Sequence, residues 1–224
     1  MDWPLLAEVP AVGVRTLLSV ARRRSFQRGE VVFHRGDVAD SLHLVVAGNF
    51  VARITTPLGS TVILDVLGPG EVFGELALLL PERRRSATVA ALEGGETRAI
   101  YRHDFALLQD AYPDVKNTLL SLFAEKLQQM SDRLVEAHYV DADTRLRRRI
   151  VEMAERAHGR ERQPLLSFTQ EELASLAGTS RATANRVLRD EQRRGTIALS
   201  RGKTLVLGLD DLRRRCRYHE APAL

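Results

Sequence analysis

The pattern of the sequence changes once, near residue 112, and this change limits what the chain can fold into. Between Ser25 and Tyr101, short β-type runs such as VVFH and LHLVVA alternate with turn segments such as RGD, AGN and GPGE. Turns that recur about every ten residues are typical of a small antiparallel sandwich or barrel. A short helix is expected before it, around residues 12–22. After Tyr112-Pro113 the apolar residues recur at helical spacing. An α+β protein is therefore predicted, and 224 residues suffice for two domains.

The helix that follows Pro113 carries an apolar stripe. Its members alternate at spacings of three and four residues, the a/d pattern of a two-stranded coiled coil: Leu120, Phe123, Leu127, Met130, Leu134 and Ala137. The stripe could instead pack against the β domain, but the polar residues on its flanks favour a self-paired helix. We therefore expect a parallel homodimer with these six residues in its interface.

The most specific pattern of the chain is FTQEELASLAGTSRATANRVLRDEQRRGTI. Thr169 and Glu172 form a capping box before one helix, Gly178 provides a turn, and Ser180 caps a second helix. The next segment, TIALS-RG-KTLVLG, is typical of a β-hairpin that turns at RG. Upstream, Asp141 or Asp143 can cap a further helix, after a hinge at residues 139–141. This order of signals predicts a winged helix-turn-helix.

The second helix of this motif has an apolar face and a basic face. The apolar face is expected to contain Ala184, Val187, Leu188 and Glu191. Arginines on the opposite face can bind guanine or phosphate. We expect double-stranded DNA to contact this face and its neighbours, namely Thr169, Gln170, Ser180, Arg181, Ala182, Thr183, Asn185, Arg186, Arg189, Arg201 and Lys203. A merely solvated charged face is the alternative, and the ordered set of motifs disfavours it.

The distribution of charge supports a nucleic-acid partner. Residues 1–139 contain 15 basic and 17 acidic side chains, whereas residues 140–224 contain 18 basic and 12 acidic ones. A net charge of −2 is thus followed by one of +6. A basic C-terminal part suits a polyanion, and the nearly neutral first part does not.

Several other classes of protein are disfavoured. The single cysteine, Cys216, excludes an intramolecular disulfide and is expected to be a free thiol. No run is apolar enough to span a bilayer, and the first residues lack the features of a signal peptide, so we expect a cytoplasmic protein that binds no membrane. His34, His43 and His103 lie on separate segments without metal-ligand spacing. No catalytic residue, metal site or enzyme activity is predicted, although a haem ligand among these histidines stays an alternative.

The chain combines a β domain, a long dimerisation helix and a winged helix that reads TQEELASLAGTSRATANRVL. In this combination it resembles the CRP/FNR family of bacterial transcription regulators. The resemblance covers about residues 26–207. It implies a jelly-roll-like β-roll that binds cyclic nucleotides (residues 1–111), a dimerisation helix and hinge (residues 112–140) and a winged helix-turn-helix (residues 141–224). It also implies a two-fold symmetric DNA site, RNA polymerase as a partner and no required cofactor.

The stretch FGELALLLPERRRSATVAA matches the phosphate-binding cassette of that family. A cyclic nucleotide needs a cation and hydrogen-bond donors for its phosphate, and an acceptor for its ribose 2′-hydroxyl. Arg85 would pair with the phosphate, Ser86 would donate to it, Glu75 would accept from the hydroxyl, and Gly74 would admit close approach of the backbone. The predicted ligand site comprises Gly74, Glu75, Leu76, Arg85, Ser86, Ala87, Met130 and Ser131.

Two positions depart from the pattern of the family. Members that bind cyclic AMP use a Thr-Ser pair against adenine, but the matching pair here is Met130-Ser131, and methionine lacks a hydroxyl. Cyclic AMP is the expected effector, with cyclic GMP as the other candidate. In the recognition helix the family commonly has Arg-Glu at positions 181 and 182, whereas Ala182 offers only a methyl group. We expect DNA half-sites that are relaxed or changed at the base pair this glutamate would read.

The favoured hypothesis is a homodimeric DNA-binding regulator under allosteric control by a cyclic nucleotide. One alternative is a regulator whose pocket is degenerate and which senses another signal or none. Another is a regulatory subunit that controls a partner enzyme and binds no DNA, which the winged-helix segment argues against.

Overall fold

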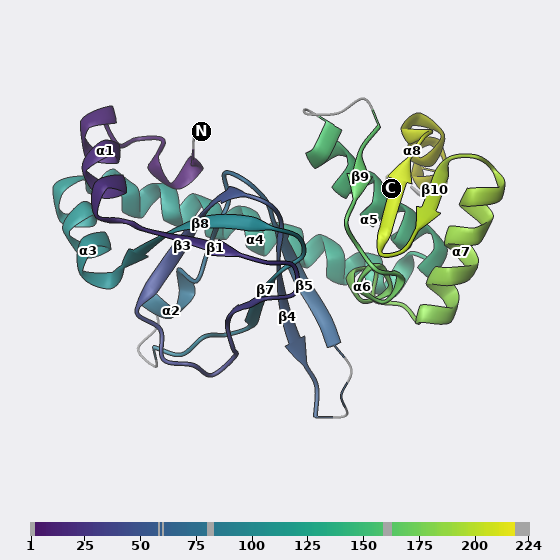
Figure 1. Cartoon of the computed structure of the whole chain (residues 1–224), viewed down its shortest axis with the longest axis horizontal. Coiled ribbons are helices and arrows are strands. Elements are labelled where there is room, and N and C mark those ends of the chain that lie inside the picture. Colours follow the sequence, from purple (N-terminus) through teal and green to yellow (C-terminus); the bar gives the residue numbers. More distant parts are fainter. Residues whose placement is uncertain (1–2, 58, 60, 80–82, 159–162, 218–224) are drawn as a thin grey trace. The chain divides into compact units, whose positions relative to one another are not determined.

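The computed structural model describes residues 3–57, 59, 61–79, 83–158 and 163–217. The chain divides into two compact units, Met1–Gln129 and Met130–Leu224. The first unit is rich in strands, and helices dominate the second (Figure 1). The predicted α+β class is confirmed. Among the helices that the structure describes, none combines the length and apolar character needed to cross a bilayer.

Two antiparallel four-stranded sheets form the body of the first unit. One sheet has the order β1 (Arg22–Phe26), β8 (Gly95–Tyr101), β3 (Ser41–Ala47), β6 (Val72–Phe73). The other has the order β2 (Val31–Phe33), β7 (Thr88–Ala91), β4 (Phe50–Thr55), β5 (Thr61–Leu67). Both sheets contribute apolar side chains to one core cluster: Phe26, Val45, Phe50, Leu67, Phe73, Val89 and Ala91. The predicted antiparallel β domain is therefore confirmed.

Helices of the first unit pack on a second core cluster. These elements are η1 (Pro4–Leu6), α1 (Ala11–Val20), α2 (Leu76–Leu79), α3 (Arg102–Ala111) and the first part of α4 (Asp114–Tyr139). The cluster joins buried residues of the sheet, such as Leu42 and Ile100, to Leu17 of α1 and Phe105 of α3. At its edge, Trp3 Nε1 donates a hydrogen bond of 3.0 Å to the carbonyl oxygen of Val45. The lead-in helix expected at residues 12–22 is observed as α1.

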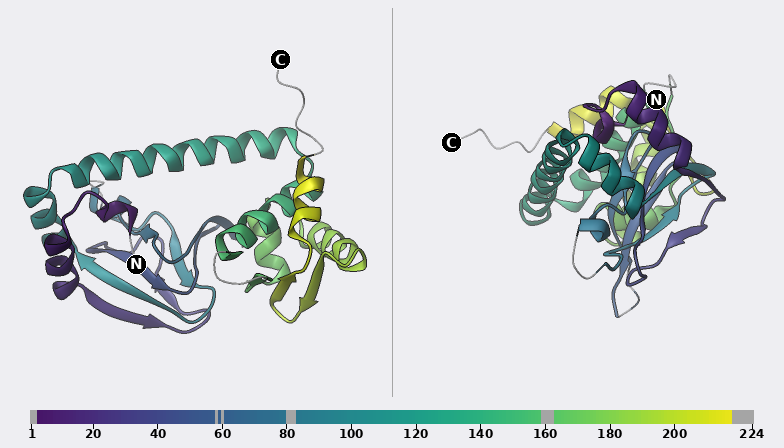
Figure 2. Two further views of the ribbon diagram at one scale, coloured as in Figure 1. Left: turned by 90° about the horizontal axis from the view of Figure 1, so that it is seen from above. Right: turned by 90° about the vertical axis from the view of Figure 1, so that its left-hand side faces the viewer.

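The long helix α4 is continuous (Figure 2) and has a buried face and an exposed face. Val115 and Leu119 are buried in the second core cluster. The predicted interface residues Leu120, Leu127, Met130 and Leu134 are each more than 60% exposed, and Ala137 is also exposed. Phe123 differs, because it is half-buried and packs against the core cluster. It lies four residues after Leu119 as well as three after Leu120, and so falls on the boundary between the two faces.

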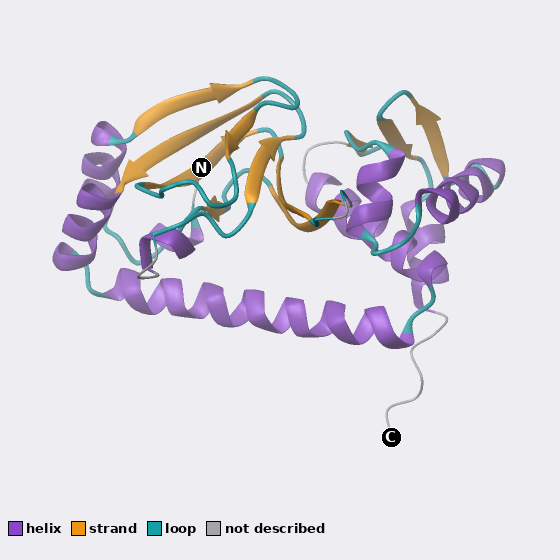
Figure 3. Cartoon of the chain, turned by 90° about the horizontal axis from the view of Figure 1, so that it is seen from below, coloured by secondary structure: helices purple, strands orange, loops and turns teal. Residues whose placement is uncertain are grey.

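The second unit contains helices and one small sheet (Figure 3). Its helices are α5 (Ala142–His158), α6 (Gln170–Leu176), α7 (Arg181–Arg193) and α8 (Leu209–Arg217). The sheet is antiparallel and has the order β10 (Ile197–Ser200), β11 (Lys203–Val206), β9 (Leu165–Leu166). Fully buried leucines and isoleucines from all four helices and β10 form the core. The predicted winged helix-turn-helix is confirmed.

The structure also identifies the cap of α5 and the state of the single cysteine. Of the two candidate caps for α5, Asp141 is the one that binds the helix end: its carboxylate accepts hydrogen bonds of 2.9 Å from Thr144 N and 2.8 Å from Thr144 Oγ1. Cys216 on α8 is a buried free thiol, as expected, and burial raises its pKa to about 11.

Candidate functional site

The cassette arginine, Arg85, lies inside the β domain, with a side chain that is only 4% exposed. Its Nη1 donates to the carbonyl oxygens of Ser41 and Gly74, at 2.7 and 3.2 Å, and its Nη2 donates to Ser41 Oγ at 3.2 Å. The guanidinium carbon also lies 4.0 Å from the centre of the Phe33 ring. A buried cation is thus held by neutral acceptors and one aromatic face.

The hydrogen-bonding capacity of Arg85 is not fully used. Within the part of the chain that the structure describes, Nε of Arg85 is the one buried side-chain nitrogen or oxygen atom without a hydrogen-bond partner. The carboxylate of Asp40 approaches Nη2 to 3.9 Å, but Asp40 itself is 68% exposed. Burial lowers the pKa of Arg85, and the charges of Asp40, Asp37 and Glu75 oppose this change. A buried cation with an unused donor and a distant, solvated counter-ion suits an anionic ligand.

Gly74 makes the position of Arg85 sterically feasible. Its φ is +85°, and a Cβ added to it would lie 2.6 Å from Arg85 Nη1. Any side chain here would displace the guanidinium and would also strain the backbone. We expected the space beside Gly74 to admit a ligand. In the structure, the guanidinium of Arg85 occupies that space, because its Nη1 bonds the carbonyl oxygen of Gly74.

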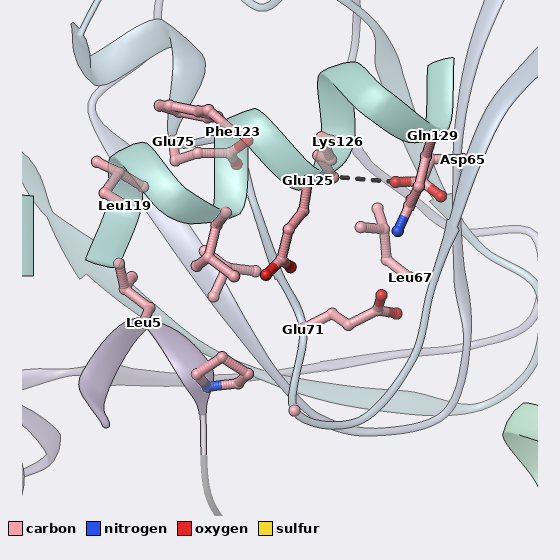
Figure 4. Close-up of a pocket in the computed structure, with 14 residues that line it drawn as sticks. Leu5, Asp65, Leu67, Glu71, Glu75, Leu119, Phe123, Glu125, Lys126 and Gln129 are labelled. Carbon is pink, nitrogen blue, oxygen red and sulfur yellow. Dashed lines mark ion pairs between the residues drawn. The ribbon is translucent and has the colours of Figure 1, made fainter. Parts of the chain in front are cut away.

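The cassette acid, Glu75, lines a cavity of about 210 Å³ between η1, the β5–β6 segment and α4 (Figure 4). Its side chain is buried, and burial raises its pKa, while the charge of Lys126 opposes the increase. Lys126 Nζ forms an ion pair with Asp65 at 3.3 Å, which joins α4 to β5. The remaining polar side chains that line the cavity are Glu71, Glu125 and Gln129. The cavity therefore offers several acceptors and one cation to a bound molecule.

The structure brings only some of the predicted ligand residues together. Arg85 donates a hydrogen bond to the carbonyl oxygen of Gly74. Ala87, two residues after Arg85, is also buried. Ser86, Leu76, Met130 and Ser131 are exposed. Sequence reasoning missed Lys126 and Gln129, although a signal was present. Leu119, Leu122, Lys126 and Gln129 form a second stripe with spacings of three, four and three, and all four line the cavity.

The histidines considered as haem ligands differ in their environments. His43 is buried, its Nδ1 lies 3.0 Å from Thr97 Oγ1, and its ring stacks on Phe73. Burial, assisted by the charges of Arg85 and Arg24, lowers the pKa of His43 to about 3, so the ring is neutral. His34 and His103 are exposed.

Helix α7 has the two faces that the sequence predicted. Ala184, Val187, Leu188 and Glu191 are buried. The caps are also as predicted: Thr169 and Glu172 form the capping box of α6, and Ser180 Oγ accepts a hydrogen bond of 3.1 Å from Thr183 N. The outward face is exposed at Arg181, Ala182, Arg186 and Arg189.

Residues from three elements surround one groove of about 330 Å³. Thr169 and Gln170 line it from the start of α6, Arg181 from the start of α7, and Arg201 and Lys203 from the β10–β11 hairpin. The three cations are exposed. The hairpin turns at the predicted RG dipeptide, where glycine has a φ of +68° and Ser200 pairs with Lys203. The fold thus brings together five of the predicted DNA residues around a basic groove.

Two other predicted DNA residues are held by contacts within the second unit. Asn185 Nδ2 donates to Gln170 Oε1 at 2.9 Å, which ties α7 to α6. Arg186 forms an ion pair and hydrogen bond with Asp143 in the first turn of α5. Asp143 was considered a helix cap, but its carboxylate binds this arginine instead.

Glu191 has a role that the sequence did not suggest. It is completely buried and accepts hydrogen bonds from Arg147 Nε at 2.8 Å, from Thr196 Oγ1 at 2.7 Å and from Arg215. Burial alone would raise its pKa, but the hydrogen bonds from Thr196, Arg147 and Arg215 outweigh burial and lower it. We expected Glu191 on the inward face of α7, and there it joins α7 to α5 and α8.

Comparisons with known proteins cover both units. A family model described as a cyclic nucleotide-binding domain matches residues 23–112, and one described as a Crp-like helix-turn-helix domain matches residues 144–215. A cyclic AMP receptor protein of Thermus thermophilus is 34% identical over 203 residues, which cover 91% of this chain and 92% of that protein. A CRP-like cAMP-activated global transcriptional regulator of Mycobacterium tuberculosis is 31% identical over 198 residues, with coverage of 86% and 87%.

Solved structures agree with these matches. The catabolite activator protein of Thermus thermophilus superposes with a TM-score of 0.54 at 32% identity, over 95% of this chain and 98% of that one. The c-di-GMP responsive global regulator CLP of Xanthomonas campestris has a TM-score of 0.74 at 24% identity, over 88% and 99% of the two chains, and supports the fold.

Proposed function

The chain belongs to the CRP/FNR family of transcription regulators, and from this premise we propose that it is a homodimeric regulator whose DNA binding is controlled by a cyclic nucleotide. The observation that carries the proposal is Arg85, a buried cation with an unused Nε donor and only a distant carboxylate. Cyclic AMP is the leading candidate, because the relatives from Thermus and Mycobacterium are named for it.

The cassette supplies the groups that a cyclic phosphodiester needs. Arg85 donates to the neutral carbonyl oxygens of Ser41 and Gly74, so its positive charge is not cancelled by them. A phosphate that receives hydrogen bonds from Arg85 would provide the missing negative charge and could use Nε. Glu75, the next residue after Gly74, would accept a hydrogen bond from the ribose 2′-hydroxyl.

Contact with the ligand can reach α4 through the cavity beside Glu75. Lys126 of α4 lines this cavity, and its ion pair with Asp65 links α4 to β5. A ligand that binds more tightly when the Lys126–Asp65 pair has one arrangement would favour the conformation of α4 with that arrangement. The size of the shift is set by the difference in the ligand's affinity for the two conformations. Because Met130 cannot replace a threonine hydroxyl, we expect weak discrimination between adenine and guanine.

The exposed arginines of the second unit support recognition of double-stranded DNA, and we propose that the site is two-fold symmetric and that the protein acts in the cytoplasm. Arg186 and Arg181 on α7 would read bases, whereas Arg201 and Lys203 of the hairpin would bind phosphates. Ala182 leaves the corresponding base pair without a hydrogen bond from this position. Half-sites about one helical turn apart follow from a two-fold dimer.

The exposed stripe on α4 supports the homodimer. Leu120, Leu127, Met130 and Leu134 are large apolar side chains that are mostly exposed in the single chain. A contiguous apolar stripe with coiled-coil spacing is stable in water when a second copy covers it. Sedimentation should therefore report twice the chain mass of 25.0 kDa.

Thermal unfolding of the full chain with cyclic AMP, cyclic GMP and linear AMP tests the ligand. A cyclic nucleotide at a hundred times its dissociation constant should add about 2.7 kcal/mol of stability, and linear AMP, with a different phosphate, should add much less. If no cyclic nucleotide raises the midpoint, the pocket serves another signal or none, and the cyclic-nucleotide part of the proposal is wrong.

A further inference from the structure

One of the two arginines proposed to read bases is already bound to a carboxylate of its own unit. Arg186 lies on the outward face of α7 and its side chain is 62% exposed, while the paired Asp143 side chain on α5 is 27% exposed. Residues 143 and 186 are far apart in the sequence, and the packing of α5 against α7 brings them together. The hydrogen bond and charge of Asp143 raise the pKa of Arg186.

Capping of α5 does not require Asp143. Thr144 N, a donor at the start of the helix, is satisfied by Asp141, which also accepts from Thr144 Oγ1. The carboxylate of Asp143 is therefore available to Arg186, and it lies beside the surface that DNA is expected to cover. A negative charge at such a surface opposes the binding of a polyanion in general.

The ion pair between Asp143 and Arg186 should affect the recognition of guanine and of phosphate by Arg186 differently. Phosphate attracts an arginine chiefly through charge, whereas guanine is recognised by two N–H groups aimed at O6 and N7. A guanidinium has five N–H donors, so one that bonds Asp143 keeps donors for a base and is held in one orientation. A phosphate near the same guanidinium would also face the charge of Asp143.

We propose that Asp143 determines the DNA specificity of this protein by holding Arg186 for guanine and by disfavouring contacts between Arg186 and phosphates. Asp143 acts through Arg186 and is a positioning residue. The hairpin cations differ from Arg186, because Arg201 and Lys203 are exposed, line the groove with Arg181 and Glu171, and are suited to phosphate. The inference rests on the proposed DNA-binding function and adds a source of sequence discrimination to it.

The test compares the full-length wild type, Asp143→Asn and Asp210→Asn. Asp210 lies in the first turn of α8 and pairs with Arg213 at 2.8 Å, so its variant removes the same charge elsewhere in the unit. Affinity is measured by fluorescence anisotropy, with cyclic AMP present and absent, for two duplexes of equal length. One carries the sequence that the wild type selects in vitro, and the other is random.

Asp143→Asn should bind the random duplex about three- to tenfold more tightly, and its ratio of specific to random affinity should fall by about tenfold. On the random duplex, the slope of log K against log salt should steepen by about 0.9, as expected for one more phosphate contact. Asp210→Asn should change both affinities slightly and equally. Asp143→Ser is a second variant, in case the amide disturbs folding, and should shift the ratio in the same direction.

Equal tightening on both duplexes, or no change on random DNA, would overturn the proposal. The variant Arg186→Ala provides a further check, because Asp143→Asn should have no effect on the ratio when Arg186 is absent. A persistent effect would mean that Asp143 acts on DNA directly, which is contrary to the proposal. If the wild type selects no sequence with or without cyclic AMP, the DNA-binding proposal itself fails, and this result is distinct from the others.

Discussion

Arg85 in the β domain and Arg186 in the winged-helix unit are both expected to bind anionic or electronegative groups, yet their surroundings are opposite. Arg85 is buried among neutral acceptors, and its carboxylate neighbour, Asp40, is distant and solvated. Arg186 is exposed and bonded directly to Asp143. The buried site leaves a cation in need of an anion, whereas the exposed site has its charge already matched.

The two environments provide selectivity in different ways. In a buried site, few competitors reach the cation, and the cost of desolvating it favours any ligand that supplies the missing charge. On an exposed face every phosphate of a nucleic acid reaches the cation, so affinity alone would be indiscriminate. A neighbouring carboxylate then adds selectivity, because it penalises a phosphate more than a neutral base.

Alanine substitution of the two arginines should give the largest contrast. Arg85→Ala should lose nucleotide-dependent stabilisation entirely, and the unliganded protein should lose about 1–3 kcal/mol because the carbonyl oxygens of Ser41 and Gly74 lose their donor. Arg186→Ala should leave the midpoint of thermal unfolding and its response to nucleotide unchanged. Arg83→Ala is the matched control, since Arg83 is exposed on the same loop. If Arg83→Ala and Arg85→Ala lost similar amounts of stability and of nucleotide-dependent stabilisation, the distinction between the buried and the exposed arginine would be wrong.

Glu75→Gln should change the dependence of stability on pH. Burial raises the pKa of Glu75 above its unfolded value, so ionisation of this carboxyl disfavours the folded state as the pH rises through the folded pKa. The variant should therefore be more stable than the wild type at pH 7 without ligand, and the difference should vanish below about pH 4.

The same variant should bind cyclic nucleotides more weakly, as followed by calorimetry, because an amide is a poorer acceptor than a carboxylate. Glu125→Gln is the control, because Glu125 also lines the cavity but is exposed. Destabilisation of Glu75→Gln at pH 7, or a difference that does not depend on pH, would contradict the assigned environment of Glu75.

The smallest effect is expected from Asp40→Asn. The carboxylate of Asp40 lies 3.9 Å from Arg85 Nη2 and would compete with a phosphate for it. Because Asp40 is largely solvated, its removal should tighten nucleotide binding by only about two- to fivefold in calorimetric titrations. Asp104→Asn, a change of the same charge in the first turn of α3, should have no such effect. Weaker binding by Asp40→Asn would show that Asp40 orients Arg85 for the ligand.

The sequence predicted the features that depend on local patterns. The capping box at Thr169, the cap at Ser180 and the buried face of α7 each depend on residues within about two helical turns of one another, so spacing and residue type were sufficient. The hairpin turn at residues 201 and 202 was predictable for the same reason, because glycine there adopts a positive φ.

Contacts between distant residues were not predictable in this way. Ser41 and Arg85 are 44 residues apart, Asp143 and Arg186 are 43 apart, and Arg147 and Glu191 are 44 apart. Each pairing depends on how a sheet registers or how two helices pack, which no spacing in a single sequence encodes. The second stripe of α4, with Lys126 and Gln129, was visible in the sequence but was hidden by the stronger apolar stripe beside it.

The buried position of Glu191 has a mechanical consequence. This one carboxylate receives hydrogen bonds from Arg147 of α5, Arg215 of α8 and Thr196 beside β10, so a rotation of α7 against its neighbours would break several charge-assisted hydrogen bonds to a buried group. The winged-helix unit should behave as a stiff lever. A displacement at the start of α5 should then move α7 together with it.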